Sequence, residues 1–327
     1  MSLGRRLFLA LAIALPVCLA GWLVWLSARQ TGAGPPPGLP SPSSPASVET
    51  SVPPESGGRD GKREGPGGPG EQPDGDRPLR GAVVVIDPGH NPDNHQHTRE
   101  IARQVDIGTG RKECDTTGTA TASGYAEASF ALDVARRART LLERQGATVE
   151  FTHDGDRPYG PCIDERARIG NEAKADAVVS VHADGSGRGN RGFHVIAPAR
   201  VREGAADTTR IAGPSHRLGE HLSDAFAEAT GFEPSNYLGD TVAATGLVVR
   251  GDLGGLNLSR VPKVFLECGN MRDPYDARRL TDPAWRERAA RGIADGVAAY
   301  LRGAGDRPHG GAHRADPPDL AGRPSVR

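Results

Sequence analysis

Short apolar runs rich in valine alternate along this chain with longer segments in which apolar residues recur every three or four positions. The short runs, which have the length of buried strands, lie at 82–87, 147–153, 176–184, 192–198, 246–250 and 261–269. Helical periodicity marks 127–146, 163–175, 215–231 and 283–303. This alternation predicts one α/β domain, with a mostly parallel, twisted sheet and helices on both of its faces.

The periodic pattern is confined to residues 80–303, and the flanking sequence has a different character. Residues 30–79 and 304–327 are dominated by Gly, Pro, Ser and charged residues, so they bury too little apolar surface to fold and are predicted to be a disordered linker and tail. Within residues 1–29, two arginines precede an uncharged apolar run, Leu7–Leu26, which is long enough to span a bilayer with its N-terminus inside. A cleaved signal peptide is the alternative. Either reading predicts export, as a membrane-anchored extracytoplasmic domain or as a secreted protein.

Export changes what the cysteines imply. Cys114 and Cys162 lie in loop-like sequence, whereas Cys268 ends an apolar strand pattern. Because oxidising conditions favour pairing, we expect a Cys114–Cys162 disulfide and a buried Cys268, with three free thiols as the alternative. The formal net charge is −1 with both signs interspersed, which argues against a nucleic-acid partner.

Three polar residues end apolar strands of the predicted sheet. His90, His182 and Glu267 each follow such a run, and the carboxyl ends of parallel strands meet at the edge where ligands bind. A hydrolytic zinc site takes three His or carboxylate ligands and keeps a fourth position open. His90 and His182 would supply two ligands. Glu127 is the candidate for the third, although it could equally be an acidic first-turn residue favoured by the helix dipole.

Four ordered blocks carry a family resemblance: "VVVIDPGH", "GYAEASFALDVA", "VVSVHADG" and "VPKVFLECGNMRD". They resemble the signature blocks of zinc-dependent N-acetylmuramoyl-L-alanine amidases of the amidase_3 type. Two further stretches, "KECDTTGTATASGYAEA" and "GPCIDERARIGN", contain Cys114 and Cys162 and resemble the compact actinobacterial members. The resemblance implies one Zn²⁺ per domain, held by His90, Glu127 and His182, with Glu267 as the catalytic glutamate. The expected reaction is hydrolysis of the amide between N-acetylmuramic acid and L-alanine in peptidoglycan.

Other residues near these blocks have expected supporting roles. We expect Asp87 to accept a hydrogen bond from a ligand imidazole, and Asp184 and Asn270 to contact substrate or to cap turns. The resemblance suggests that Leu253 and Leu256 shape the substrate groove, with ordinary core positions as the alternative. The long 91–126 stretch is expected to form a lid or a cleft wall. His95 and His97 within it are expected to be solvent-exposed.

Two other functions are compatible with the same blocks. A non-catalytic peptidoglycan-binding or scaffold protein would keep the fold without the activity, and a zinc peptidase would cut wall peptides, although no H-E-x-x-H motif is present. The expected partners are peptidoglycan and, through the N-terminal segment, a membrane. We expect a monomer, and the sequence does not indicate whether the activity requires an activator.

Overall fold

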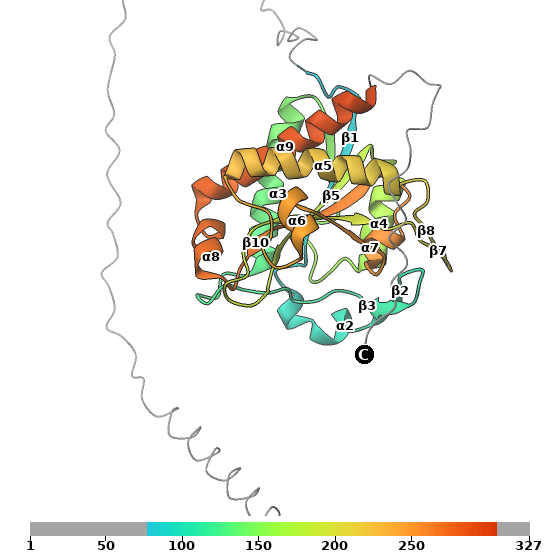
Figure 1. Ribbon diagram of the computed structural model, residues 1–327. Helices are drawn as coiled ribbons and strands as arrows, with labels where there is room; N and C mark the ends of the chain where they lie inside the picture. The colour runs from blue at the N-terminus through green and yellow to red at the C-terminus, as the bar shows by residue number, and fades with distance from the viewer. Residues whose placement is uncertain (1–76, 306–327) are drawn as a thin grey trace, which may run out of the picture. The chain divides into compact units, whose positions relative to one another are not determined.

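The computed structural model describes residues 77–305 (Figure 1). The predicted membrane segment at 1–29, almost all of the predicted linker at 30–79 and almost all of the predicted tail at 304–327 lie outside this range. Within it, no helix combines the length and the apolar character that crossing a membrane requires.

The elements appear in the alternating order that the sequence pattern predicts. The strands are β1 (Val83–Pro88), β2 (Gln104–Asp106), β3 (Arg111–Glu113), β4 (Thr148–Phe151), β5 (Ala177–Asp184), β6 (His194–Pro198), β7 (Arg202–Glu203), β8 (Ala206–Asp207), β9 (Leu247–Arg250) and β10 (Lys263–Asn270). The helices are η2 (Asn94–Gln96), α2 (Thr98–Ile101), α3 (Glu127–Arg144), α4 (Ile163–Glu172), α5 (Ala212–Thr230), α6 (Asp240–Thr245), α7 (Gly254–Asn257), α8 (Pro274–Leu280) and α9 (Pro283–Gly305).

A six-stranded sheet forms the centre, in the order β4-β1-β5-β10-β6-β9. The first four strands run parallel to one another, β6 is antiparallel to β10, and β9 is parallel to β6. The sheet is therefore mostly parallel, as predicted. The carboxyl ends of β1, β5 and β10 lie side by side, because these three strands are adjacent.

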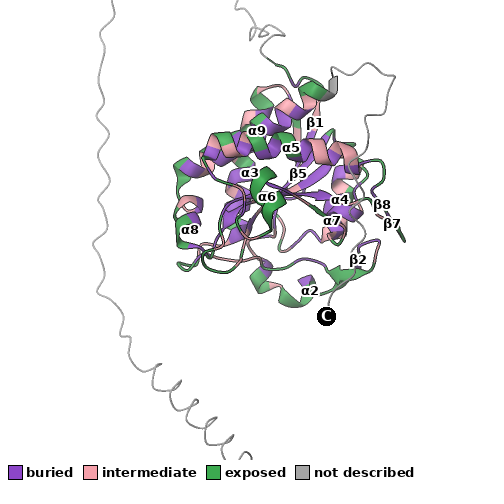
Figure 2. Cartoon of the chain, in the orientation of Figure 1, coloured by how far each residue is buried: buried purple, intermediate pink, exposed green. Residues whose placement is uncertain are grey.

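The two faces of the sheet bury different side chains. On one face, strand residues such as Val84, Val181 and Leu266 belong to the main core together with Phe130 of α3 and Trp285 of α9. The opposite face has a smaller cluster, in which Val85 and Val178 pack with Ala175 and Val261. Figure 2 shows buried residues along the central strands and exposed residues on the outer sides of the surrounding helices. The predicted coverage of both faces is thus confirmed.

Two of the long helices are followed by a glycine that can adopt the left-handed conformation in which helices commonly end. α3 is followed by Gly146 at φ 96°, and α5 by Gly231 at φ 66°, a left-handed conformation that glycine adopts without a steric penalty. The short helix α8 has a strong start signal, since the Asp273 side chain accepts hydrogen bonds from the backbone N–H groups of Tyr275 and Asp276.

The 91–126 stretch contains more structure than a loop. It holds η2, α2 and the antiparallel pair β2–β3, which forms a small separate sheet. These elements escape sequence analysis because β3 is fully exposed and β2 buries only its central residue, so neither has an apolar run. The stretch returns to the main domain at Glu127, where α3 begins.

Candidate metal centre

Three side chains converge at the carboxyl edge of the sheet. His90 follows β1, His182 lies near the end of β5, and Glu127 is the first residue of α3. One nitrogen of each imidazole and one carboxylate oxygen all lie within 4.8 Å of one another. His90 Nε2 lies 3.1 Å from Glu127 Oε1, and His182 Nδ1 lies 2.9 Å from the same oxygen. The structure therefore brings together the three residues that the sequence selects as ligands.

Backbone N–H groups fix the carboxylate of Glu127. Thr119 N–H donates to Oε2 at 2.9 Å, and Ala183 N–H donates to Oε1 at 3.3 Å. A hypothetical Cβ on Gly118 would lie 2.8 Å from both Glu127 Oε2 and His90 Cδ2, so the chain approaches the site closely at a residue without a side chain. Glu127 is thus held in place by its surroundings and is more than a first-turn acid.

The second nitrogen of His90 determines how the ring is oriented. Nδ1 lies 3.1 Å from the carbonyl oxygen of Thr116, which can only accept, so Nδ1 donates to it and Nε2, which faces Glu127, is the nitrogen placed to bind a cation. Asp115 Oδ1 lies 3.4 Å from the same nitrogen. Asp115 and Thr116 were not selected from the sequence: they directly follow Cys114 in a cysteine-containing stretch that has no apolar run to indicate where their side chains point.

The electrostatics of the cluster are those of a cation site. Burial alone would lower the pKa of His90, but the charges and hydrogen bonds of Glu127 and Asp115 outweigh it and raise the pKa to about 10. Burial would likewise raise the pKa of Glu127, but the neighbouring histidines hold it well below its ordinary value. The negative charge and the lone pairs that bind this proton so strongly can also bind a metal ion, which then takes the place of the proton.

Glu267 lies next to the cluster on β10. Its register partners are His182 on β5 and His194 on β6, so these three side chains form one row on the same face of the sheet. Glu267 Oε2 is buried and has no hydrogen-bond partner among the described residues. Burial, together with the negative charges of Glu127 and Asp184, raises the pKa of Glu267 well above its ordinary value. Such a carboxyl group is suited to accept and release a proton.

His194 completes this row on β6. The residue is 5 % exposed, and Nδ1 lies 2.9 Å from Ser235 Oγ. Its ring lies edge-on to Tyr237, whose hydroxyl donates to Asp184 Oδ2. Burial lowers the pKa of His194 to about 4, so the ring is neutral. The carboxylate of Asp184 therefore accepts from Tyr237 through Oδ2, and its Oδ1 accepts from the N–H group of Gly185.

Asn270 was expected to contact substrate or to cap turns, and the structure shows the second role. Its side-chain amide donates to the carbonyl oxygens of Ser186, Gly187 and Asn190, and its Oδ1 accepts from Arg272 N–H. The residue is fully buried. It organises the loop that follows β5.

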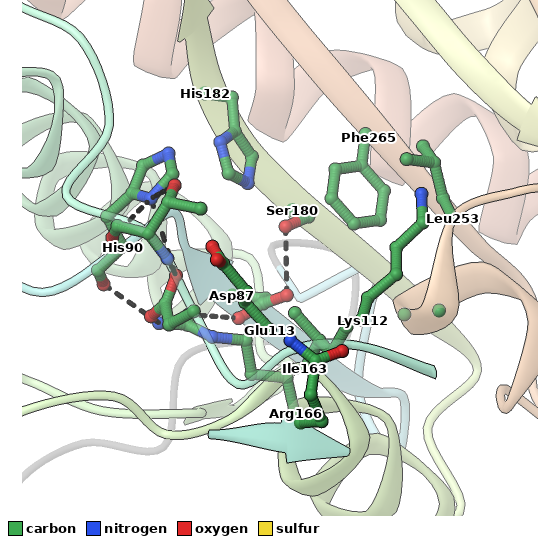
Figure 3. A pocket seen from close by; sticks show the side chains of 15 residues that line it. Asp87, His90, Lys112, Glu113, Ile163, Arg166, Ser180, His182, Leu253 and Phe265 are labelled. Carbon is green, nitrogen blue, oxygen red and sulfur yellow. Dashed lines mark hydrogen bonds and ion pairs between the residues drawn. The ribbon is translucent and has the colours of Figure 1, made fainter. Parts of the chain in front are cut away.

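A cavity of about 470 Å³ adjoins the two histidines (Figure 3). Ile163, Leu253 and Phe265 form its apolar wall, and Phe265 stacks on His182 with ring centroids 5.2 Å apart. Gln104, Lys112, Glu113, Asp115 and Thr116 of the 91–126 stretch also line it. The stretch is therefore a cleft wall, one of its two expected roles. Leu253 lines the cavity, but Leu256 is fully buried in the interior and is an ordinary core residue.

The hydrogen-bond partner predicted for Asp87, a ligand imidazole, was wrong. Its carboxylate accepts hydrogen bonds from Thr152, Arg166, Ser180 and Lys263 and from no imidazole. Asp87 lies beneath the cavity and is 1 % exposed, so it requires these cations and hydroxyls to remain charged. The carboxylate beside a ligand imidazole is Asp115.

The remaining cysteine and histidine predictions concern the surroundings of the site. Cys114 and Cys162 are joined by a disulfide that links the 91–126 stretch to the start of α4, and Cys268 is a buried free thiol. His95 is exposed and His97 is partly exposed, and neither belongs to the metal cluster.

A His–Glu–His set with a free carboxyl group beside a cleft is the arrangement of a metal-dependent hydrolase. Residues 84–299 match the family Amidase_3, N-acetylmuramoyl-L-alanine amidase. The chain belongs to this family of peptidoglycan amidases, and the resemblance of the four sequence blocks is confirmed.

Individual relatives agree with this assignment. The chain is 38% identical over 224 residues to the N-acetylmuramoyl-L-alanine amidase Rv3717 of Mycobacterium tuberculosis, a match that covers 68% of this chain and 88% of the relative. It resembles the crystal structure of the amidase Ami1 from Mycobacterium smegmatis with a TM-score of 0.61 and 38% identity, covering 68% of this chain and 98% of that one. For apo Ami1 from Mycobacterium abscessus the TM-score is 0.62 and the identity 39%, over 68% and 100% of the two chains.

Proposed function

We propose that this chain is an exported zinc amidase in which His90, Glu127 and His182 hold the metal and Glu267 acts as general base. The observation that carries the proposal is the convergence of the three ligand atoms within 4.8 Å beside a carboxyl group that has an unpartnered, buried oxygen. Two imidazoles and one carboxylate are a donor set that suits Zn²⁺ and leaves a coordination position open for catalysis.

Zn²⁺ in this site would polarise the amide carbonyl and lower the pKa of water. Glu267 accepts a proton from the water that attacks the carbonyl carbon, and returns it to the nitrogen of L-alanine as the amide bond breaks. The muramic acid lactyl group leaves as a carboxylate, and the stem peptide leaves with a free amine. Phe265 and Leu253 on one side, and the 91–126 stretch on the other, bound the cavity beside these groups.

The location proposed for this activity comes from the sequence alone. The apolar run Leu7–Leu26 would anchor the chain in the membrane or direct its secretion, and residues 30–79 would let the domain reach the wall. Fully extended, a linker of this length spans about 150 Å at about 3.1 Å per residue.

The decisive test compares the wild-type chain with Glu267→Gln. We expect stoichiometric zinc in both by elemental analysis, and a kcat about 10²- to 10⁴-fold lower in the variant, because the general base is lost while the ligands remain. Products released from purified peptidoglycan are identified by mass spectrometry as stem peptides with a free L-alanine amine. Glu228→Gln, an exposed carboxylate on α5, is the matched control and should retain full activity.

Three outcomes would contradict the proposal in different ways. A metal-free wild-type chain would exclude the three-ligand site. Zinc-loaded wild type that releases no stem peptide would favour an activator-dependent enzyme or a wall-binding protein. Products with cut cross-bridges and intact lactyl amides would identify a peptidase.

A further inference from the structure

Arg166 on α4 is a buried arginine whose five N–H donors are all used. Its side chain is 6% exposed, and a guanidinium group has five donors in a fixed planar arrangement. Nε donates to Pro161 O at 2.9 Å, Nη1 to Asp87 Oδ1 at 2.8 Å and Pro88 O at 2.6 Å, and Nη2 to His90 O and Asp115 Oδ2, both at 2.9 Å. Figure 3 shows Arg166 beneath the cavity, on the side away from Phe265.

One of these contacts holds the backbone of a metal-site histidine. His90 has φ 60°, in the left-handed region that residues with a side chain rarely adopt. A backbone in this conformation persists only when its surroundings fix it. Arg166 does so by binding the carbonyl oxygens of Pro88 and His90, on either side of the turn that takes the chain out of β1.

Another contact holds the imidazole ring of the same residue. The carboxylate of Asp115 is shared: Oδ2 accepts from Arg166 at 2.9 Å, and Oδ1 lies 3.4 Å from His90 Nδ1. Arg166 therefore reaches both the main chain and, through one carboxylate, the ring of His90.

We propose that Arg166 is a positioning residue that sets the metal affinity of the site by fixing His90 in its ligand geometry. The inference rests on the proposed function, which makes His90 a zinc ligand. Lysine cannot replace Arg166, because a single ammonium group with three donors cannot span five acceptors in one plane. A purely structural role would instead predict that Arg166 contributes to folding and leaves metal affinity unchanged.

The test measures the zinc Kd of the full-length chain, purified in detergent, by competition with a chromophoric chelator. We expect Arg166→Lys to bind zinc about 10- to 100-fold more weakly, the range that supporting partners of metal ligands typically contribute. Leu218→Ala is the control for lost stability. Leu218 is fully buried on α5, in the core on the other face of the sheet, so its truncation destabilises the fold without touching the site.

Each outcome decides the inference. A zinc Kd for Arg166→Lys equal to that of the wild type overturns it, as does an equal weakening in Leu218→Ala. If Arg166→Lys does not fold, Asp115→Asn decides: at least tenfold weaker zinc binding supports the inference, and wild-type affinity overturns it. A wild-type chain without zinc affinity overturns the proposed metal centre and this inference together, whereas unchanged binding in the variants overturns this inference alone.

Discussion

Single residues at the end of β1 decide whether a metal site can exist there. Gly89 separates the strand from His90, and an added Cβ at this position would lie 2.5 Å from Nδ1 and 2.7 Å from Nε2 of His182. Real Cβ atoms do not approach other atoms so closely, so a side chain here would push one ligand out of place. The glycine of the "DPGH" block is therefore required by the approach of the two histidines.

Gly89→Ala should weaken zinc binding at least tenfold, because the methyl group displaces the His182 ring from the ligand position. The zinc Kd measured by chelator competition checks this. Gly187→Ala is the matched control, since its Cβ would meet only Asn190 Nδ2, at an ordinary 3.7 Å. Equal zinc affinity in both variants would show that the ring can move without loss of binding.

Asp87 should make the folded state sensitive to acid. Burial by itself would raise its pKa, but the charges of Lys263 and Arg166 hold the pKa well below the ordinary 3.8. A carboxylate with a lowered folded-state pKa contributes stability that is fully present above the unfolded-state value and is lost as the pH falls below it. The expected loss therefore lies in the acid range below about pH 4.

The measurement is the free energy of unfolding by urea from about pH 5 to about pH 2. We expect a steep decrease in the wild type and a slope shallower by up to about 1.4 kcal/mol per pH unit in Asp87→Asn, which removes one titrating proton. The variant should also be less stable at neutral pH, because Lys263 and Arg166 lose a buried counter-charge. Parallel slopes in the two proteins would exclude Asp87 as a source of the acid sensitivity.

At the scale of the elements, helices α5 and α9 pack with their backbones close together at two glycines of α9. A Cβ on Gly296 of α9 would lie 2.7 Å from Leu222 Cα of α5, and a Cβ on Gly292 would lie 2.9 Å from Phe226 Cα. These neighbours are backbone atoms, which cannot rotate away. Two glycines four residues apart thus let the helices pack with their backbones close together over one face of the sheet.

Gly296→Ala should destabilise the protein by about 1–3 kcal/mol, since the added methyl forces the helices apart. Alanine is favoured over glycine by about 1 kcal/mol in a helix interior, so intrinsic propensity alone predicts the opposite sign. Gly303→Ala on the same helix is the control, because its Cβ would meet only His221 Nε2, at 4.0 Å. Urea denaturation of both variants at pH 7 compares them, and a stabilised Gly296→Ala would refute close packing.

At the scale of the whole molecule, the described domain contains both the candidate metal centre and the groups that support it. The proposed ligands come from β5, α3 and the end of β1, the cleft walls come from the 91–126 stretch and the segment before β10, and Arg166 comes from α4. Every one of these parts lies within residues 77–305. By the proposal above, the segments outside this range would determine where in the cell envelope the domain acts.

We expect residues 77–305 produced alone to cleave a soluble muropeptide with the same kcat/KM as the full-length chain, because no residue of the site is removed. The full-length chain should sediment with membranes and the shortened chain should not. Amidase assays and membrane flotation check the two statements separately. A large loss of kcat/KM in the shortened chain would show that the flanking segments take part in substrate binding.

The sequence by itself determined the strands of the sheet, the long helices and the three side chains that the structure brings together at its edge. Buried strands and amphipathic helices have distinct periods of apolar residues, and a histidine or glutamate that directly follows a buried strand has its position fixed by that strand. His90, His182 and Glu267 could be found in this way. Glu127 needed the family resemblance, since its place at a helix start has a common alternative explanation.

Only the tertiary structure decided which groups support the site. These groups are Arg166, Asp115 and Thr116, which lie far in sequence from the groups they hold or belong to no periodic apolar pattern. A charged residue in a helix, such as Arg166, is normally expected to be exposed. The same reason explains the error at Asp87, whose partner Ser180 comes from the adjacent strand β5 and whose partner Lys263 comes from β10, one strand further on. Periodicity records which side of an element is buried, whereas hydrogen-bond partners depend on which elements lie next to each other.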